Sequence, residues 1–291
     1  RKKTILGLDT ETNGLDPLQN QVLLIQVGDE SEQYVIDVWK TGDAIFEFLE
    51  VLESKDISKV MHNAKFDYSF IKSNFNVSLQ NIRCTMIGEQ LLTAGRKHGK
   101  GLAAVCDKYL GKILSKEEQK SFVDLPLGSV FTKDQLKYAA DDIAVLVPLY
   151  RKIQALLDKR NMRELSVLEY QTISVTADME LKGIFLDKGA WLSLKDKAIE
   201  GATKAKKKLD KHFEPYCERD LFGDLTINYN SPKQIQPILQ KLTGTYIPST
   251  SEAALRRLSH PSIQDLLKYR EHQKRVTTYG DDFFRKNVSP V

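Results

Sequence analysis

Several features that define other classes of protein are missing from this sequence. Its 291 residues include three cysteines, Cys84, Cys106 and Cys217, and no two of them form a CxxC pair. This excludes a disulfide framework and a cysteine-based zinc site, and it fits a reducing compartment. No apolar run approaches the roughly 18–20 residues that cross a bilayer, so we expect no membrane-spanning helix. We also find no internal repeat, no low-complexity tract and no linker rich in Gly, Ser or Pro.

The composition that is present is that of a globular chain. Hydrophobic residues make up 41% and charged residues 28% of the sequence, which is enough apolar material for a sizeable core. At roughly 100–200 residues per domain, the length suits two domains. Residues 1–150 carry 18 Lys and Arg against 21 Asp and Glu, whereas residues 151–291 carry 25 against 18. This asymmetry suggests metal or acid chemistry in the first half and a polyanionic partner for the second, although ordinary variation of surface charge explains it equally well.

The first half alternates strand-like and helix-like patterns. Short apolar runs rich in β-branched residues predict strands, and apolar residues at helical spacing predict helices between and after them. The predicted strands are Thr4–Leu8, Gln21–Val27, Gln33–Val38 and Lys59–His62, and the predicted helices are Ile45–Leu52, Phe66–Ile71 and Leu136–Leu156. This order predicts an α/β layout with a mixed sheet covered by helices.

The second half has almost no strand signal. Its predicted helices are Leu165–Leu181, Gly189–Phe213, Lys233–Leu242, a helix from Thr250 to Leu258 and Ser262–Tyr279. A brief extended segment, Gly183–Asp187, separates the first two of these. Because no breaker-rich linker divides the halves, we expect one helix to run into the next near residues 159–164.

Acidic residues follow two of the predicted strands. Asp9 and Glu11 stand at the end of the first strand, and side chains two apart on a strand point to the same face, so both carboxylates can reach one spot. Asn63 and Asp67 follow the fourth strand and are four apart, one above the other on a new helix. Taken alone, the second pattern is most often a helix cap followed by an exposed acid.

A third acidic pattern lies on a late helix, where Tyr138 and Asp142 are also i, i+4 neighbours. Each of the three patterns is weak alone. Their order and context resemble the three motifs of the DEDDy 3′–5′ exonucleases, most strongly the proofreading domain of family A (DNA polymerase I-like) enzymes. The segments that carry the resemblance are Asp9-Thr10-Glu11-Thr12-Asn13-Gly14-Leu15-Asp16, His62-Asn63-Ala64-Lys65-Phe66-Asp67 and Tyr138-Ala139-Ala140-Asp141-Asp142.

The resemblance implies a set of catalytic residues: Asp9, Glu11, Asp67, Tyr138 and Asp142. Four carboxylates at one site would destabilise one another unless cations bind among them. Oxygen ligands suit Mg²⁺ or Mn²⁺, and phosphodiester hydrolysis commonly uses two such ions. We therefore expect the four acids to hold two divalent cations and Tyr138 to orient the attacking water. The same resemblance assigns the binding of the substrate 3′ end to Thr10, Leu15, Asn63, Phe66 and Arg96.

The basic second half offers candidate phosphate contacts. Lys204, Lys207, Lys208 and Lys211 form a basic stripe at helical spacing, for which a solvated helix face is the better interpretation. The run Asn228–Gln234 places small polar side chains and free amides at a helix start, which favours phosphate binding. Helical spacing also groups Arg270, Lys274 and Thr277 on one face.

This half resembles the thumb of family A polymerases. By that match the duplex-binding residues are Asn228, Asn230, Ser231, Lys233, Arg270, Lys274 and Thr277. The expected architecture is an α/β ribonuclease H-like exonuclease domain over residues 1–160, followed by an all-α thumb domain over residues 161–291. The palm motifs of these polymerases are absent, so this chain alone cannot synthesise DNA, and we expect it to be a piece of a longer protein from which palm and fingers are missing.

The resemblance also sets expectations for the cellular role. We expect proofreading in DNA replication and repair, with a single-stranded 3′ end and primer-template duplex DNA as partners, a monomeric state, no membrane, and a bacterial or phage-infected cytoplasm, or an organelle if the source is eukaryotic. Two alternatives are a stand-alone ribonuclease D or Werner-like exonuclease, and a non-catalytic DNA-binding clamp with an inactive nuclease fold. The turn at Asn230–Lys233 argues against the first, and the intact acidic set argues against the second.

Overall fold

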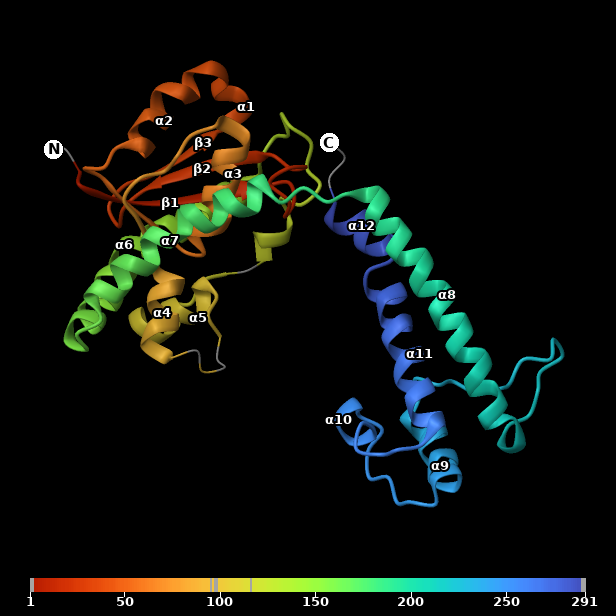
Figure 1. The fold of residues 1–291 in the computed structure, drawn as a ribbon. Coiled ribbons are helices and arrows are strands. Elements are labelled where there is room, and N and C mark those ends of the chain that lie inside the picture. Colours follow the sequence, from red (N-terminus) through yellow and green to blue (C-terminus); the bar gives the residue numbers. More distant parts are fainter. Residues whose placement is uncertain (1–2, 95, 97–98, 116, 289–291) are drawn as a thin grey trace. The chain divides into compact units, whose positions relative to one another are not determined.

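The computed structural model describes residues 3–94, 96, 99–115 and 117–288. By their contacts these residues form two compact units, Arg1–Gly183 and Ile184–Val291, and Figure 1 shows the elements of each. The first unit is a sheet with helices on both faces. The second unit is helical.

A five-stranded mixed sheet forms the centre of the first unit. Its strands are β1 (Ile5–Thr12), β2 (Val22–Gly28), β3 (Gln33–Asp37), β4 (Ser58–Met61) and β5 (Ile82–Cys84). They are ordered β3-β2-β1-β4-β5, in which β2 is antiparallel to both of its neighbours, β1 and β3, and β4 is parallel to both of its neighbours, β1 and β5. The central strand is therefore β1, which carries Asp9 and Glu11.

Helices cover both faces of this sheet. The helices of the unit are α1 (Val38–Thr41), α2 (Ile45–Glu53), α3 (Ala64–Phe75), α4 (Thr85–Thr93), α5 (Leu102–Leu110), α6 (Lys133–Lys159) and α7 (Arg163–Lys182), with 3₁₀ turns at Gly42–Ala44 and Glu117–Lys120. Leu6 and Leu8 of β1 join a core cluster with residues of α2 and α3. The alternate β1 residues face α6, because successive side chains of a strand point to opposite faces.

Helix α6 comes unusually close to β1, and a glycine allows it. A Cβ added at Gly7 would lie 3.3 Å from both the Ile143 carbonyl oxygen and the Leu146 Cβ. The helix begins with a capping box, in which the Thr132 hydroxyl accepts from the Gln135 N–H at 3.1 Å and the Gln135 side chain accepts from the Thr132 N–H at 2.9 Å. The capping box sets the residue at which α6 begins, and therefore which of its residues lie over the sheet.

The structure confirms the α/β layout and changes several details. The acids lie within β1, which continues past them to Thr12. A fifth strand, β5, was not predicted, because three residues are too few for a periodic signal. Near residues 159–164 one helix follows the next, as expected, with a short break: α6 ends at Lys159, α7 begins at Arg163, and Asn161 between them has a left-handed backbone with φ 57°.

The boundary between the compact units lies after Gly183, later than the predicted domain boundary at residue 160. The reason is that α7 packs on α3, where Lys65 pairs with Glu180 at 2.6 Å and the Tyr68 hydroxyl donates to Asp178 at 3.0 Å. The assignment of residues 1–160 to the exonuclease and 161–291 to a thumb remains a prediction.

The second unit contains α8 (Lys188–Phe213), α9 (Pro232–Thr243), α10 (Glu252–Leu255), α11 (Pro261–Thr278) and α12 (Asp281–Asn287), with a 3₁₀ turn at Glu214–Tyr216. Helices α8 and α11 lie side by side (Figure 1), and their lower ends share a core with α9 that includes Phe213, Ile235 and Leu266. The expected helix from Thr250 to Leu258 is shorter in the structure. None of the helices in the described part of the chain has both the length and the apolar character that crossing a membrane requires.

Candidate active site

Two acids come from the central strand. Asp9 and Glu11 lie on the α6 face of β1, opposite Gln26 and Leu24 of β2 respectively, and both are half-buried. Thr10 lies between them and points to the other face, where it is buried. The strand thus presents two carboxylates toward α6 and one hydroxyl toward α3.

A third acid comes from the first turn of α3. This helix starts after Asn63, an exposed residue with a left-handed backbone (φ 61°), so the chain turns sharply from β4 into α3. Asp67 is 2% exposed, and its Oδ1 accepts two hydrogen bonds from Thr10, at 3.1 Å from the backbone nitrogen and 2.8 Å from the hydroxyl. These bonds join two motifs that are 57 residues apart in the sequence.

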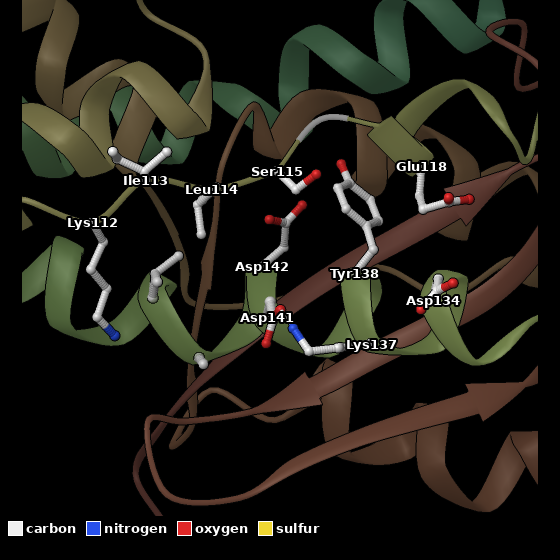
Figure 2. A pocket seen from close by; sticks show the side chains of 12 residues that line it. Lys112, Ile113, Leu114, Ser115, Glu118, Asp134, Lys137, Tyr138, Asp141 and Asp142 are labelled. Atoms are coloured by element: carbon white, nitrogen blue, oxygen red, sulfur yellow. Dashed lines mark hydrogen bonds and ion pairs between the residues drawn. The ribbon is translucent and has the colours of Figure 1, made fainter.

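The fourth acid and the tyrosine come from α6. Tyr138 and Asp142 are one helical turn apart on α6, and the Tyr138 hydroxyl lies close enough to the Asp142 carboxylate to favour its charged form. Their side chains lie next to each other in Figure 2, on the same side of α6. The structure therefore brings together all five of the residues that the sequence predicts to be catalytic, from three elements of the first unit.

Burial and mutual repulsion raise the pKa values of all four acids. Burial, followed by the charges of Asp67, Glu11 and Asp142, raises the pKa of Asp9 well above its usual value. Burial and the charges of Asp142 and Asp67 raise the pKa of Glu11 to about 8. Burial raises the pKa of Asp67 to about 7, against the hydrogen bonds from Thr10 that favour its charged form, and burial raises the pKa of Asp142 to about 6. A cation bound between these carboxylates would offset their mutual repulsion and so favour their ionised forms.

The ligand chemistry of these acids fits hard divalent cations. All of their donor atoms are carboxylate oxygens, which Mg²⁺ and Mn²⁺ prefer. In the part of the chain that the structure describes, no three His, Cys, Asp or Glu side chains already surround a common point that could hold an ion. The acids therefore fit divalent cations by the type of their ligand atoms and by their negative charge.

Next to Tyr138 and Asp142 the surface is hollowed into a pocket of about 440 Å³. Figure 2 shows its lining, in which Ser115 and Glu118 from the segment before α6 stand opposite the helix. Lys112 and Lys137 add positive charge to the rim, although Lys137 is paired with Asp141 at 2.7 Å. Sequence reasoning did not single out Ser115 or Lys112, because the loop that carries them has no periodic pattern.

The residues expected at the substrate 3′ end differ in their surroundings. Leu15 is 81% exposed, as a residue that packs against a substrate base could be. Phe66 is half-buried and packs on Phe70, with ring centroids 4.8 Å apart. Arg96 is exposed at a depression lined also by Lys108 and Arg160. The assignment of these side chains to the 3′ end remains a prediction.

A histidine that sequence reasoning left without a role ties two segments of this region together. The His62 ring nitrogens lie 2.9 Å from the Thr85 hydroxyl and 2.9 Å from the Lys100 carbonyl oxygen. Burial lowers the pKa of His62 to about 4, so the ring is neutral near pH 7. Since a carbonyl oxygen only accepts, the neutral ring carries its hydrogen on Nε2 and donates it to Lys100.

The expected duplex-binding residues all lie in the second unit, and most are exposed. Asn228, Asn230, Lys233, Lys274 and Thr277 are open to solvent. Ser231 precedes α9, and its hydroxyl accepts no backbone N–H of the helix, so its side chain makes no cap there.

Arg270 differs from the other residues of this set. It is half-buried, and its guanidinium donates to the carbonyl oxygens of Tyr229 at 3.2 Å and Thr250 at 2.6 Å. In the structure Arg270 therefore holds two turns of its own unit, while DNA contact by this residue remains a prediction.

When the sequence is compared with known protein families, it matches one family. A family model described as 3′-5′ exonuclease, of the DNA polymerase A type, matches residues 1–158. A DNA polymerase I of Aquifex aeolicus is 28% identical over 84% of this chain and 41% of its own length, and one of Borreliella burgdorferi is 27% identical over 97% and 32%. A ribonuclease D of Pseudomonas paraeruginosa is 29% identical over 55% of this chain and 41% of its own length. The chain thus spans less than half the length of these relatives.

Two solved structures illustrate the fold. The polymerase domain of Pol1 from M. smegmatis, solved with DNA primer-template and dNTP, matches 98% of this chain and 46% of its own chain with a TM-score of 0.75 and 18% identity. Brucella melitensis NrnC with bound Mg²⁺ matches 62% of this chain and 87% of its own with a TM-score of 0.55 and 21% identity. At these identities the likeness shows the fold alone.

Proposed function

The chain belongs to the 3′-5′ exonuclease family of the DNA polymerase A type, which covers residues 1–158, and from this we propose that it removes nucleotides from DNA 3′ ends as a proofreading nuclease. The observation that carries the proposal is the gathering of Asp9, Glu11, Asp67 and Asp142 beside Tyr138. The bacterial polymerase relatives support a bacterial cytoplasm and a role in DNA replication and repair.

In this proposal the four carboxylates hold two Mg²⁺ or Mn²⁺ ions. When bound, such ions lower the pKa of a water molecule and stabilise the charge on a leaving oxygen. Thr10 keeps the Asp67 carboxylate in place through its two hydrogen bonds. Burial and the charge of Asp142 raise the pKa of Tyr138 far above its usual value, so its hydroxyl remains protonated and acts as an orienting donor to the attacking water.

We further propose that the second unit grips primer-template duplex DNA as a polymerase thumb, with the chain acting as a monomer beside palm and fingers. The excess of Lys and Arg in residues 151–291 and the exposure of Asn228, Lys233 and Lys274 support this. Contacts of this kind bind the DNA backbone without reading its sequence.

The test is a comparison of substrates. End-labelled single-stranded DNA, DNA duplex with a mismatched 3′ end, and single-stranded RNA are each incubated with Mg²⁺, with EDTA as the control. We expect stepwise release of nucleotides from both DNA substrates in Mg²⁺ only. The variant Asp9→Ala/Glu11→Ala should lose this release and keep its circular dichroism spectrum, and retained release would contradict the assignment of the site.

A second candidate is RNA trimming, which the ribonuclease D relative of the first half favours. Preference for RNA in the same assay would support it. If the protein released no nucleotides from any substrate, with or without Mg²⁺, and still bound duplex DNA, the result would instead indicate the non-catalytic clamp.

A further inference from the structure

Gln26 is a buried polar residue without a partner in a strand that is otherwise apolar. It lies in the middle of β2, whose sequence is Val-Leu-Leu-Ile-Gln-Val-Gly, and it is 0% exposed. Neither its amide nitrogen nor its amide oxygen has a hydrogen-bond partner within the described residues. A buried polar group left unpaired costs about 1–3 kcal/mol, so leucine or methionine would suit the packing better. Such a residue calls for an explanation beyond packing.

The sheet register places this amide beside the acids. Gln26 lies directly opposite Asp9 in the antiparallel pair of β1 and β2. Side chains directly opposite in such a pair point to the same face, with Cβ atoms about 4.5–5.5 Å apart. Gln26 therefore faces α6 together with Asp9, while its neighbour Ile25 belongs to the core cluster on the opposite face.

An amide is a suitable partner for a carboxylate that holds a cation. Oxygens of a ligating carboxylate that are not directed at the ion accept hydrogen bonds, and these bonds fix its orientation. The Gln26 amide nitrogen has two hydrogens to donate. No other residue of β2 on this face has a donor in its side chain, because the neighbours on that face are Leu24 and Gly28.

We propose that Gln26 is a positioning residue for the nuclease site: when the divalent cation is bound, Gln26 donates an amide N–H to the Asp9 carboxylate and orients that carboxylate toward the cation. This rests on the proposed function, because it takes the four acids to be cation ligands. Gln26 itself touches neither the cation nor the substrate.

The first test is a titration of Mn²⁺ into the metal-free protein, followed by electron paramagnetic resonance. Gln26→Met has nearly the same volume and no donor, and Ile25→Met places the same side chain on the opposite face of the same strand as the control. We expect Gln26→Met to bind Mn²⁺ about 10–100-fold more weakly than the wild type, and Ile25→Met to bind within about twofold of it. In EDTA, Gln26→Met should be at least as stable as the wild type, because it removes an unpaired amide.

Equal Mn²⁺ affinity of Gln26→Met and the wild type would overturn the proposal and leave Gln26 as a packing residue. A wild type that binds no Mn²⁺ would instead overturn the proposed function, so the two failures are distinguishable.

A second measurement needs no stable variant. In a ¹H–¹⁵N spectrum of the wild type, the side-chain amide signal of Gln26 should shift and exchange more slowly with solvent when Mg²⁺ is added. An unchanged signal under saturating Mg²⁺ would also overturn the proposal.

Discussion

At the scale of single residues, hydrogen bonds between side chains of separate segments hold the site together. Thr10 donates twice to Asp67, and neutral His62 links Thr85 to the Lys100 carbonyl. The acids and Tyr138 were named from the resemblance to the exonuclease motifs, because spacing shows only which side chains share a face and each of the three patterns is weak alone. The bonds between distant segments were not predictable, since no local pattern specifies which hydroxyl will meet Asp67.

Removal of the Tyr138 hydroxyl tests its role as a donor. In Tyr138→Phe the attacking water loses a positioned partner, and positioned groups that assist proton transfer contribute about 10²–10⁴-fold to rate. We expect kcat for release of the terminal nucleotide to fall about 100-fold or more, with little change in KM. Rapid-quench kinetics on single-stranded DNA would measure this, and a kcat within about twofold of the wild type would exclude the proposed role.

At the scale of elements, close approach of helices determines which substitutions the fold tolerates. The apolar patterns predicted the strands β1 to β4 and the helices α2, α3, α6 and α7, because long periodic segments are governed by burial. They missed β5, which has three residues, and the break at Asn161, where a single left-handed residue separates two helices. Both depend on packing in space that a local pattern does not contain.

Gly88 of α4 tests one such approach. An added Cβ there would lie 2.6 Å from the Ile153 Cγ2 atom and 3.2 Å from the Tyr170 hydroxyl. Alanine gains about 1 kcal/mol of helix propensity over glycine, but overpacking a buried contact costs about 1–3 kcal/mol. We expect Gly88→Ala to lower the free energy of unfolding in urea titrations, whereas Gly189→Ala in α8, with no atom nearer than 3.4 Å, should maintain or raise it. A stabilised Gly88→Ala would show that α4 can move away from α6.

Arg270 tests the link between two turns of the second unit. Arg270→Lys cannot reach both the Tyr229 and the Thr250 carbonyl oxygens with a rigid fork of donors. Each carbonyl left unpaired in a buried position costs about 1–3 kcal/mol. We expect this variant to lower the stability of the second unit by about that amount, measured by urea denaturation, while the exposed Lys274→Met remains as stable as the wild type. Equal stability of both variants would mean that the two turns are held by other contacts.

At the scale of the whole molecule, charge and pH act differently on the two units. The acids of the first unit resist ionisation in the absence of cations, whereas residues 151–291 carry 25 Lys and Arg against 18 Asp and Glu. The charge asymmetry was visible in the sequence. The raised pKa values were not, because they depend on burial and on distances between separate elements.

The raised pKa values predict a loss of stability with rising pH in EDTA. Between pH 6.5 and 8.5 the unfolded acids are already ionised, whereas Asp67, with a pKa of about 7, and Glu11, with a pKa of about 8, still bind protons in the folded state. The folded state then binds more protons than the unfolded state, so stability falls as pH rises. Thermal denaturation should show a falling Tm over this range in EDTA and a smaller fall in Mg²⁺, which binds the ionised carboxylates. The variant Asp9→Asn/Glu11→Gln should weaken the trend in EDTA, and a Tm that rises through this range would contradict it.

The exposed lysines of the second unit predict salt-dependent binding of duplex DNA. Each phosphate contact contributes about −0.9 to the slope of log K against log salt concentration. Lys274→Met should weaken binding similarly for all DNA sequences and reduce the magnitude of the slope by about 1. Fluorescence anisotropy with a labelled duplex at several salt concentrations would measure both effects. The control is Ile25→Met, which lies in the first unit and should leave the slope unchanged. An unchanged slope in Lys274→Met would show that Lys274 does not contact the DNA.

The central position of β1 also has a consequence for biosynthesis. Strand β1 is translated first among the strands, yet the helix that completes its site, α6, begins at Lys133. Because domains fold as units while the chain emerges from the N-terminal end, Asp9, Glu11 and Asp67 leave the ribosome long before Asp142 can join them. A nascent chain that ends before α6 therefore has three of the four acids, and under the proposed function such an unfinished translation product would release no nucleotides.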